Sequence, residues 1–245
     1  MRLILLLALT IMATVTAADL PTHDSVRAAL KTIVAEGNGG FGLNMWATVV
    51  DRDGQVVLVC HSGENRGDQW PGSRVISAQK ANTANAFSLP GLALSTANLF
   101  TATQPGGSLY GLQHSNPVDT AIAYGGKSSD IGSTKDPMIG KKIGGVNIFG
   151  GGLALYGADG VLIGAIGVSG DSSVADHIIC WKLRTALKLN FVPGGISPTG
   201  DDNMVLDIVN GVSAGGWGHA LTTPAAKVIV DGLPKSHPIS KVAGK

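Results

Sequence analysis

Charged and aromatic residues are scarce in this sequence of 245 residues. Asp, Glu, Lys and Arg together make up 14% of the chain, the net charge is +1, and Phe, Trp and Tyr contribute 5%. Without a basic surface there is no electrostatic reason to expect binding to nucleic acid or to an anionic membrane. Hydrophobic residues still account for 44%, which is typical of a folded chain and not of a disordered one.

Long apolar runs are missing after the first residues. The chain opens with Met1 and Arg2, continues with an apolar run over residues 3–15, and reaches the small residues Ala17 and Ala18. This run is too short to span a bilayer, which needs about 20 residues, and the order of charge, apolar run and small residues is typical of a secretory signal peptide. We therefore expect residues 1–18 to be a signal peptide and the mature protein to be periplasmic or secreted, with no membrane attachment.

Cysteine occurs only twice, at Cys60 and Cys180. In an oxidising compartment a disulfide between them and a pair of buried thiols are both open alternatives, because the sequence does not show how close their Cα atoms come. None of the six histidines is paired at a metal-site spacing such as H-x-x-x-H. A dedicated zinc site is therefore not expected.

Glycine, in contrast, is abundant, with 35 residues. Asp-Gly connections join two pairs of apolar runs and predict two β-hairpins. Apolar residues at helical spacing predict amphipathic helices before, between and after these hairpins. The expected strands are residues 43–50, 55–59, 153–156 and 161–168, and the expected helices are 22–36, 74–87, 92–100 and 174–189. Hairpins interleaved with helices predict an α/β (α+β) fold, with an antiparallel sheet flanked by helices.

The length after signal removal fits one domain with an appendage. We expect the domain to cover residues 19–189. Residues 190–245 shift to glycine and proline, with strand-like runs at 204–209 and 227–230, and are expected to wrap the domain or a neighbouring subunit. Residues 104–151 lack periodic apolar positions, and so long an irregular stretch in a compact domain is more often functional than idle.

Cys60 and His61 end the second strand and open a polar loop over residues 61–73. Imidazole and thiolate are both ligands of haem iron, so His61 is the candidate metal ligand and Cys60 a second candidate. The alternative for His61 is an ordinary exposed histidine at the end of a strand.

Two further features, Lys80 and the turn at Ser169 and Gly170, are candidates for anion binding, and Asp176 is a further candidate for the cofactor site. Lys80 lies on the apolar side of its helix, from which it either snorkels to solvent or reaches a ligand carboxylate. The turn ending in Ser169 and Gly170 precedes a helix whose free backbone N–H groups suit an anion, unless it is a plain tight turn. Asp176, three residues after Ser173, fits a capping box, which is a structural role. His177, next to it, is expected on the solvated face of the helix.

A G-x-S-x-G motif at residues 211–215, followed by Asp231 and His237, has the order of a serine-hydrolase triad. That chemistry needs the serine on a turn between a strand and a helix. The residues that follow here are Gly216, Trp217 and Gly218, which are poor helix formers, so the hydrolase hypothesis is not favoured.

Three segments, in this order, resemble the GlcG/HbpS family over about residues 24–189. The run from Asp159 to Gly170, with the sequence DGVLIGAIGVSG, is the most specific. The helix segment QKANTA at residues 79–84 is similar to the family's K-A-x-T-A helix, and VVDRDGQ at residues 49–55 to its V-V-D-x-x-G hairpin. The resemblance implies an α/β sandwich with an antiparallel sheet, a homo-oligomer, and binding of haem or a similar flat cofactor, with haem degradation proposed for the family.

By this resemblance His61 would be an axial ligand, and Lys80 or the helix start at Ser169 and Gly170 would meet a haem propionate. The polar segment from Cys60 to Gly67 departs from the family's usual R-M-D-G-A, which indicates either a new ligand set or a lost site. The first hypothesis is an exported haem-binding protein. An enzyme acting on a small oxyacid or on haem, and an oligomeric structural module without ligand, remain alternatives.

Overall fold

The structure is a computed structural model that describes residues 19–242. The expected signal peptide, residues 1–18, lies outside the described residues. The helices are α1 (His23–Val34), α2 (Ser73–Phe87), α3 (Phe100–Thr103), α4 (Thr120–Ala123), α5 (Ser173–Ala186) and α6 (Pro224–Ser236), with the 3-10 helices η1 (Thr96–Leu99) and η2 (Ser128–Asp130). The strands are β1 (Trp46–Asp51), β2 (Val56–His61), β3 (Gly152–Tyr156), β4 (Leu162–Ser169), β5 (Ile208–Val209) and β6 (Val212–Ser213). Over residues 19–242 no helix combines the length and hydropathy needed to cross a bilayer.

Strands β1 to β4 form one antiparallel sheet in the order β2-β1-β4-β3. The pairs β1–β2 and β3–β4 are the two hairpins expected from the sequence, and β1 joins them by pairing with β4. At the first turn Gly54 has a φ of +76°, a conformation that glycine adopts without steric cost. The predicted class, an antiparallel sheet flanked by helices, is confirmed.

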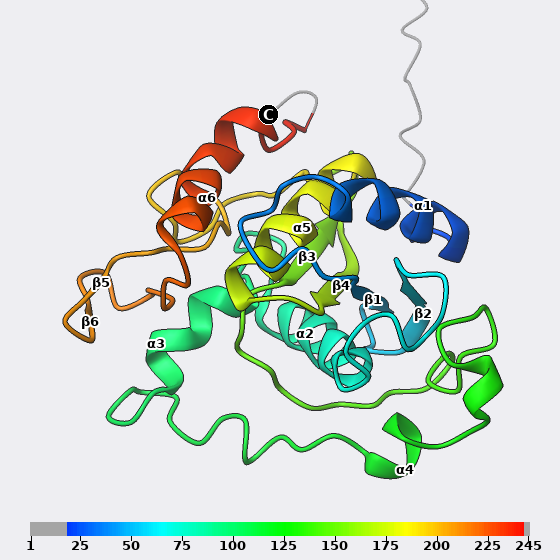
Figure 1. Ribbon diagram of the computed structural model, residues 1–245. Helices are drawn as coiled ribbons and strands as arrows, with labels where there is room; N and C mark the ends of the chain where they lie inside the picture. The colour runs from blue at the N-terminus through cyan, green and yellow to red at the C-terminus, as the bar shows by residue number, and fades with distance from the viewer. Residues whose placement is uncertain (1–18, 243–245) are drawn as a thin grey trace, which may run out of the picture.

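Helices cover both faces of the sheet (Figure 1). Helix α2 packs on one face, against β4, β1 and β3, whereas α1 and α5 lie on the other face and α6 packs against α5. Successive side chains of a strand point to opposite faces. Along β1, Ala47 and Val49 therefore join the core under α1 and α5, while Trp46 and Val50 join the core under α2.

Glycines in the sheet allow α2 to lie close to it. A Cβ atom at Gly167 would overlap the helix backbone at Ser77, and one at Gly152 would overlap it at Lys80. The helix contributes small buried side chains to the same contact: Ala78, Ala81 and Ala84. The small residues of this helix thus allow its close contact with the sheet.

Replacing Gly167 by alanine is expected to lower the free energy of unfolding by about 1–3 kcal/mol or more, because rigid backbone faces the added methyl group. Gly232 in α6 is the matched control, since a Cβ atom there meets nothing within 4 Å. Gly232→Ala should stabilise the protein by about 0.5–1 kcal/mol, the usual gain of alanine over glycine within a helix. Urea-induced unfolding measures both, and effects of the same sign would contradict the close packing.

Two helices start one residue away from the expected position. The helix expected over residues 74–87 begins at Ser73, and Gly72 is the N-cap. Helix α5 is capped by Ser172, whose hydroxyl accepts a hydrogen bond from the backbone N–H of Ala175. The capping box expected between Ser173 and Asp176 therefore does not form, and the Asp176 carboxylate is engaged elsewhere.

Short elements predicted around these helices also change. Residues 227–230, expected as a strand, lie within α6, which Thr223 caps and Pro224 begins. Buried Ala226, Val230 and Leu233 recur at helical spacing, so the helical period prevails over β propensity. The expected strand 204–209 is reduced to β5, and η1 with α3 replaces the expected helix 92–100.

Residues 190–242 pack closely on α5. Arg184 of α5 forms a bidentate ion pair with Asp202, with N–O distances of 2.6 and 2.7 Å, and neither side chain is exposed. His177 is also fully buried, and its Nε2 lies 3.1 Å from the backbone nitrogen of Met204. The expectation that His177 is solvated is wrong, because the C-terminal residues cover the face of α5 that looks exposed in the sequence.

Candidate functional site

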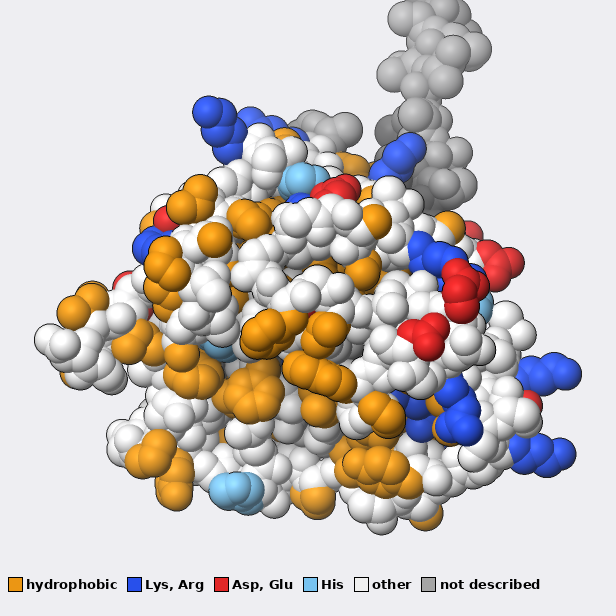
Figure 2. Space-filling view, in the orientation of Figure 1, with side chains coloured by type: hydrophobic (Ala, Val, Ile, Leu, Met, Phe, Trp, Pro, Cys, Tyr) orange, Lys and Arg blue, Asp and Glu red, His pale blue; other side chains and the backbone are white. Residues whose placement is uncertain are grey.

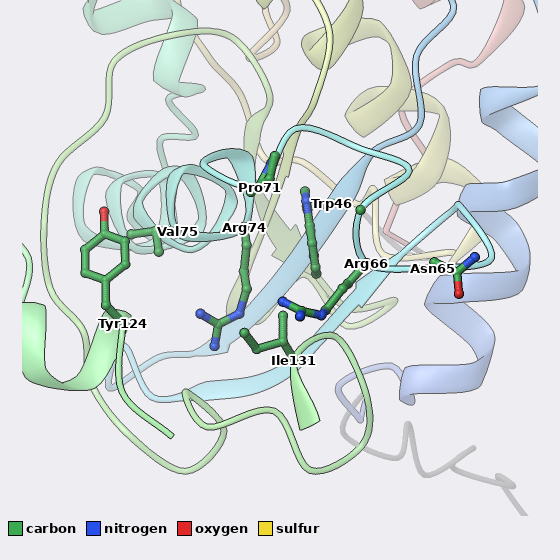
Figure 3. A pocket seen from close by; sticks show the side chains of 9 residues that line it. Trp46, Asn65, Arg66, Pro71, Arg74, Val75, Tyr124 and Ile131 are labelled. Carbon is green, nitrogen blue, oxygen red and sulfur yellow. The ribbon is translucent and has the colours of Figure 1, made fainter. Parts of the chain in front are cut away.

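A cavity of about 550 Å³ lies between the loop after β2, the start of α2 and the segment after α4. A volume of this size suits a small-molecule ligand. Figure 3 shows the side chains of Trp46, Arg66, Arg74 and Ile131 pointing toward one another in this cavity. The long irregular stretch predicted to be functional thus supplies one wall.

The cavity has one fixed aromatic wall and one exposed one. Trp46 begins β1 and is 1% exposed, and its indole Nε1 donates a hydrogen bond to the backbone oxygen of Trp70 at 3.0 Å. Tyr124, which follows α4, is 68% exposed. A ligand in the cavity would therefore cover apolar surface of Tyr124 and lie against an indole that is already held in place.

The two arginines of the cavity differ in their surroundings. Arg74 is buried and paired with Asp136, at 2.8 Å from Nε to Oδ2 and 2.5 Å from Nη2 to Oδ1. Arg66 is exposed, and within residues 19–242 no ion pair involves it. Arg66 is thus the cavity cation available to an anionic group of a ligand.

His61 lines a second, more polar cavity of about 390 Å³, which shares Asn65, Arg66 and Ile131 with the first. Its Nδ1 lies 3.0 Å from the backbone oxygen of Gly63. Because a carbonyl only accepts, Nδ1 carries the proton and Nε2 keeps its lone pair in the neutral ring. Burial lowers the pKa of His61, which favours this neutral form. His61 therefore has the protonation state that a metal ligand requires.

Lys80, Ser169 and Asp176 meet inside the protein, away from both cavities. The Lys80 Nζ donates to Asp176 Oδ2 at 2.6 Å, to the backbone oxygen of Val168 at 3.1 Å and to Ser169 Oγ at 3.4 Å. Lys80 is 1% exposed, so it does not snorkel to solvent, and its contact with a ligand carboxylate stays a prediction. Burial raises the pKa of Asp176 to about 6, while Lys80 acts in the opposite direction.

The turn at Ser169 and Gly170 is likewise occupied by the chain itself. The second carboxylate oxygen of Asp176 accepts a hydrogen bond from the backbone N–H of Asp171, which directly follows Gly170. Gly170 packs against the backbone of Asn44 and Met45. In this structure these groups join β4, α2 and α5, and the contact with a haem propionate that the resemblance implies stays a prediction.

The two cysteines are free and fully buried. Burial raises the pKa of each thiol to about 12. Cys60 contributes to the core on the side of α1 and α5, whereas His61, the next residue of the strand, contacts Trp46 on the opposite face. The Cys60 and His61 side chains therefore do not converge on one ligand. Of the two alternatives for the cysteines, a disulfide or a pair of buried thiols, the structure shows the thiols.

Trp46, Arg66 and Tyr124 are cavity residues that were not predicted from the sequence. Arg66 does lie in the polar loop after His61, but Glu64 and Asp68 flank it in the sequence, so its lack of an ion-pair partner among the described residues is a feature of the folded loop. No sequence signal exists for Trp46 and Tyr124, which are 78 positions apart in the chain. The loop conformation brings them together.

Two other kinds of site, a serine-hydrolase triad and a cluster of metal ligands, find no support in the described residues. Ser213 of the G-x-S-x-G motif lies in the β5–β6 hairpin and donates its hydroxyl proton to Asp207 Oδ1 at 2.7 Å. The strand-to-helix turn that a hydrolase needs is absent at this position. Within residues 19–242 no group of three or more His, Cys, Asp and Glu side chains could hold a metal ion.

The comparison with known protein families places this fold. Residues 22–183, which include the whole four-stranded sheet and most of α5, match the family model described as haem degrading protein HbpS-like. The chain belongs to the HbpS-like family. The match ends close to the last turn of α5. Residues 190–242, which pack on α5, therefore lie after the part of the chain that the family model matches.

Solved structures similar to this HbpS-like protein include the Klebsiella pneumoniae protein ORFY, with 24% identity, a TM-score of 0.47, and coverage of 73% of this chain and 97% of the other. A PduOC–haem complex also has 24% identity and a TM-score of 0.47, with coverage of 69% and 95%. A double mutant of HbpS from Streptomyces reticuli has 17% identity and a TM-score of 0.41, with coverage of 74% and 97%. No curated protein was found to match the sequence.

Proposed function

We propose that this HbpS-like protein binds haem or a closely related flat tetrapyrrole in the cavity beside Trp46. The observation that carries the proposal is the juxtaposition of an apolar, aromatic-walled cavity with the unpaired Arg66 and, in the adjoining cavity, with the neutral His61. Besides its iron, a haem presents apolar faces and carboxylate groups to a protein. The description of the family as haem degrading supports the same ligand class.

The donor set fits such a group. Tyr124 and Ile131 would offer apolar surface to a macrocycle beside the buried indole of Trp46, Arg66 would offer a cation to a propionate, and the His61 Nε2 would offer a nitrogen to iron. Bound haem would supply an iron centre with redox and ligand-binding chemistry. The protein's own part is to exclude water from the apolar faces, to orient the carboxylates and to keep His61 unprotonated.

Titration of the mature protein with hemin, followed by absorbance, is expected to show a saturable Soret shift. His61→Ala should alter the spectrum and weaken binding at least about tenfold, as loss of groups that hold a metal does. Arg66→Ala should weaken the binding of hemin more than the binding of hemin dimethyl ester, because only hemin carries free carboxylates.

His114→Ala and Lys142→Ala are the matched controls, since both residues are exposed and lie outside the cavities. They should bind hemin like the wild type. A wild-type protein that gives no saturable shift, or a His61→Ala variant with an unchanged spectrum, would remove haem ligation from the proposal.

We also propose that the protein acts outside the cytoplasm as a homo-oligomer. The support for export is the signal-peptide pattern of residues 1–18. The support for assembly is the number of large exposed hydrophobic side chains, among them Trp70 and the cavity residue Tyr124. Figure 2 shows hydrophobic side chains gathered near the middle of one face. Mass spectrometry of the exported chain, which shows whether residues 1–18 have been removed, tests export. Light scattering of the same protein tests assembly.

A further inference from the structure

We propose that Asp136 is a positioning residue of the ligand cavity, acting through Arg74 and the backbone of residues 123–138. The proposal rests on the function proposed above and names the residue pair that holds one wall of the site. Asp136 does not itself line either cavity. Asp136 is 2% exposed, and its carboxylate accepts hydrogen bonds from Arg74 and Gly132, which line the cavities, and from the backbone N–H of Met138 in its own segment.

The carboxylate of Asp136 fixes its own segment at two points. Oδ2 accepts a hydrogen bond from the backbone N–H of Gly132 at 2.8 Å, and Oδ1 accepts one from the N–H of Met138 at 3.0 Å. The remaining capacity of both oxygens is taken by the Arg74 guanidinium. Asp136 therefore closes the loop that carries Ile131 and joins it to α2.

Arg74 fixes the other end of the same wall. Its Nη1 donates a hydrogen bond to the backbone oxygen of Ala123 at 2.8 Å, immediately before Tyr124. One buried ion pair thus sets the position of Tyr124, Ile131 and Gly132 relative to Trp46 on the sheet. It also neutralises Arg74, so that among the described residues that line the cavity Arg66 alone presents an unpaired cation.

The position of Gly132 matters for His61. Gly132 has a φ of +77°, and a Cβ atom there would overlap the imidazole of His61 and the indole of Trp46. Its backbone oxygen lies 3.1 Å from His23 Nε2 on α1. The wall therefore rests against the proposed iron ligand, and a shift of the loop changes the room available beside Nε2. This segment has little regular structure of its own, so side-chain contacts must define it.

The test compares two buried ion pairs of the same kind. Asp136→Asn removes the charge that holds the wall, whereas Asp202→Asn does the same to the Arg184 pair under α5, away from both cavities. Amide hydrogen exchange in the ligand-free protein should become at least about tenfold faster over residues 123–138 in Asp136→Asn only. Hemin affinity at a temperature where both variants are folded should fall at least about tenfold in Asp136→Asn and remain within about twofold of wild type in Asp202→Asn.

Unchanged exchange over residues 123–138 in Asp136→Asn would overturn the proposal, whatever the affinity for hemin. Faster exchange with unchanged hemin affinity would overturn it as well, because the wall would then not belong to the site. If Asp136→Asn does not fold, Arg74→Lys, with Arg184→Lys as its control, carries the same comparison, since lysine keeps the charge but loses the fork geometry. If the wild-type protein does not bind hemin, the haem proposal is refuted. The amide hydrogen exchange of residues 123–138 then decides by itself whether Asp136 holds the wall.

Discussion

Arg184→Met is expected to lower the free energy of unfolding by about 3–5 kcal/mol, because it leaves the Asp202 carboxylate buried without its cation. Asp202 has no exposed surface, and both of its oxygens accept hydrogen bonds from Arg184. Arg184 also lies 5.0 Å from the ring centre of Trp181, so methionine keeps part of the apolar packing. Urea-induced unfolding of the exported, mature protein measures the loss.

The double variant Arg184→Met, Asp202→Leu is the decisive control. Replacing both members of a buried ion pair by apolar residues of similar size is often neutral or stabilising. The double variant should therefore recover most of the stability that the single change removes. A double variant as unstable as Arg184→Met would show that the loss comes from packing around Trp181 and not from the unpaired carboxylate.

Mild acid is expected to destabilise the protein through two buried histidines, His177 and His219. Burial lowers the pKa of His177 to about 3 and that of His219 to about 4, from an ordinary value of 6.5. Both rings are neutral in the folded protein and take up a proton more readily when it unfolds. Their contribution is therefore complete above pH 6.5 and is lost progressively as the pH falls toward 4 and 3.

The size of this effect follows from the separation of the pKa values. Each unit of separation corresponds to about 1.4 kcal/mol. Protonation of the two histidines in the unfolded chain therefore lowers the free energy of unfolding by several kcal/mol between pH 6.5 and about pH 4. Asp176, whose pKa is raised by burial to about 6, acts in the opposite direction over the same range. The difference between wild type and a histidine variant isolates the histidine contribution.

Unfolding of the wild type and of His177→Gln, measured between pH 7 and pH 4, tests the assignment. The variant should lose stability less steeply as the pH falls, because glutamine does not titrate. His114→Gln, at an exposed position, should follow the wild-type slope. Equal slopes for all three proteins would show that another group governs the acid response.

Much of the fold could be predicted because it depends on local patterns. The two Asp-Gly connections predict the hairpins, and apolar residues at helical spacing predict the main helices. The predictions failed where distant parts of the chain decide the outcome. His177 looked solvated because its helix carries polar residues on that side, and only the later residues Asn203 and Met204 show what covers it.

The candidate site was less accessible to prediction. His61 could be singled out from its place at the end of a strand and the start of a polar loop. Lys80 and Asp176 could be named as candidates, but not their pairing, since 96 positions separate them and the pairing depends on how α2 and α5 pack on opposite faces of the sheet. The residues of the cavity wall carry no periodic pattern from which their positions could be read.

The sequence by itself determined the hairpins, the main helices and the resemblance to the HbpS-like family, because turn chemistry and apolar spacing act over a few residues. The tertiary structure decided which polar groups serve the core and which face a ligand. It buried Lys80, Asp176, His177 and Arg184 as satisfied partners and left Arg66 and His61 beside cavities. The reason is that the cost of burying a charge depends on whether a partner arrives from elsewhere in the chain, and only the folded arrangement supplies that partner.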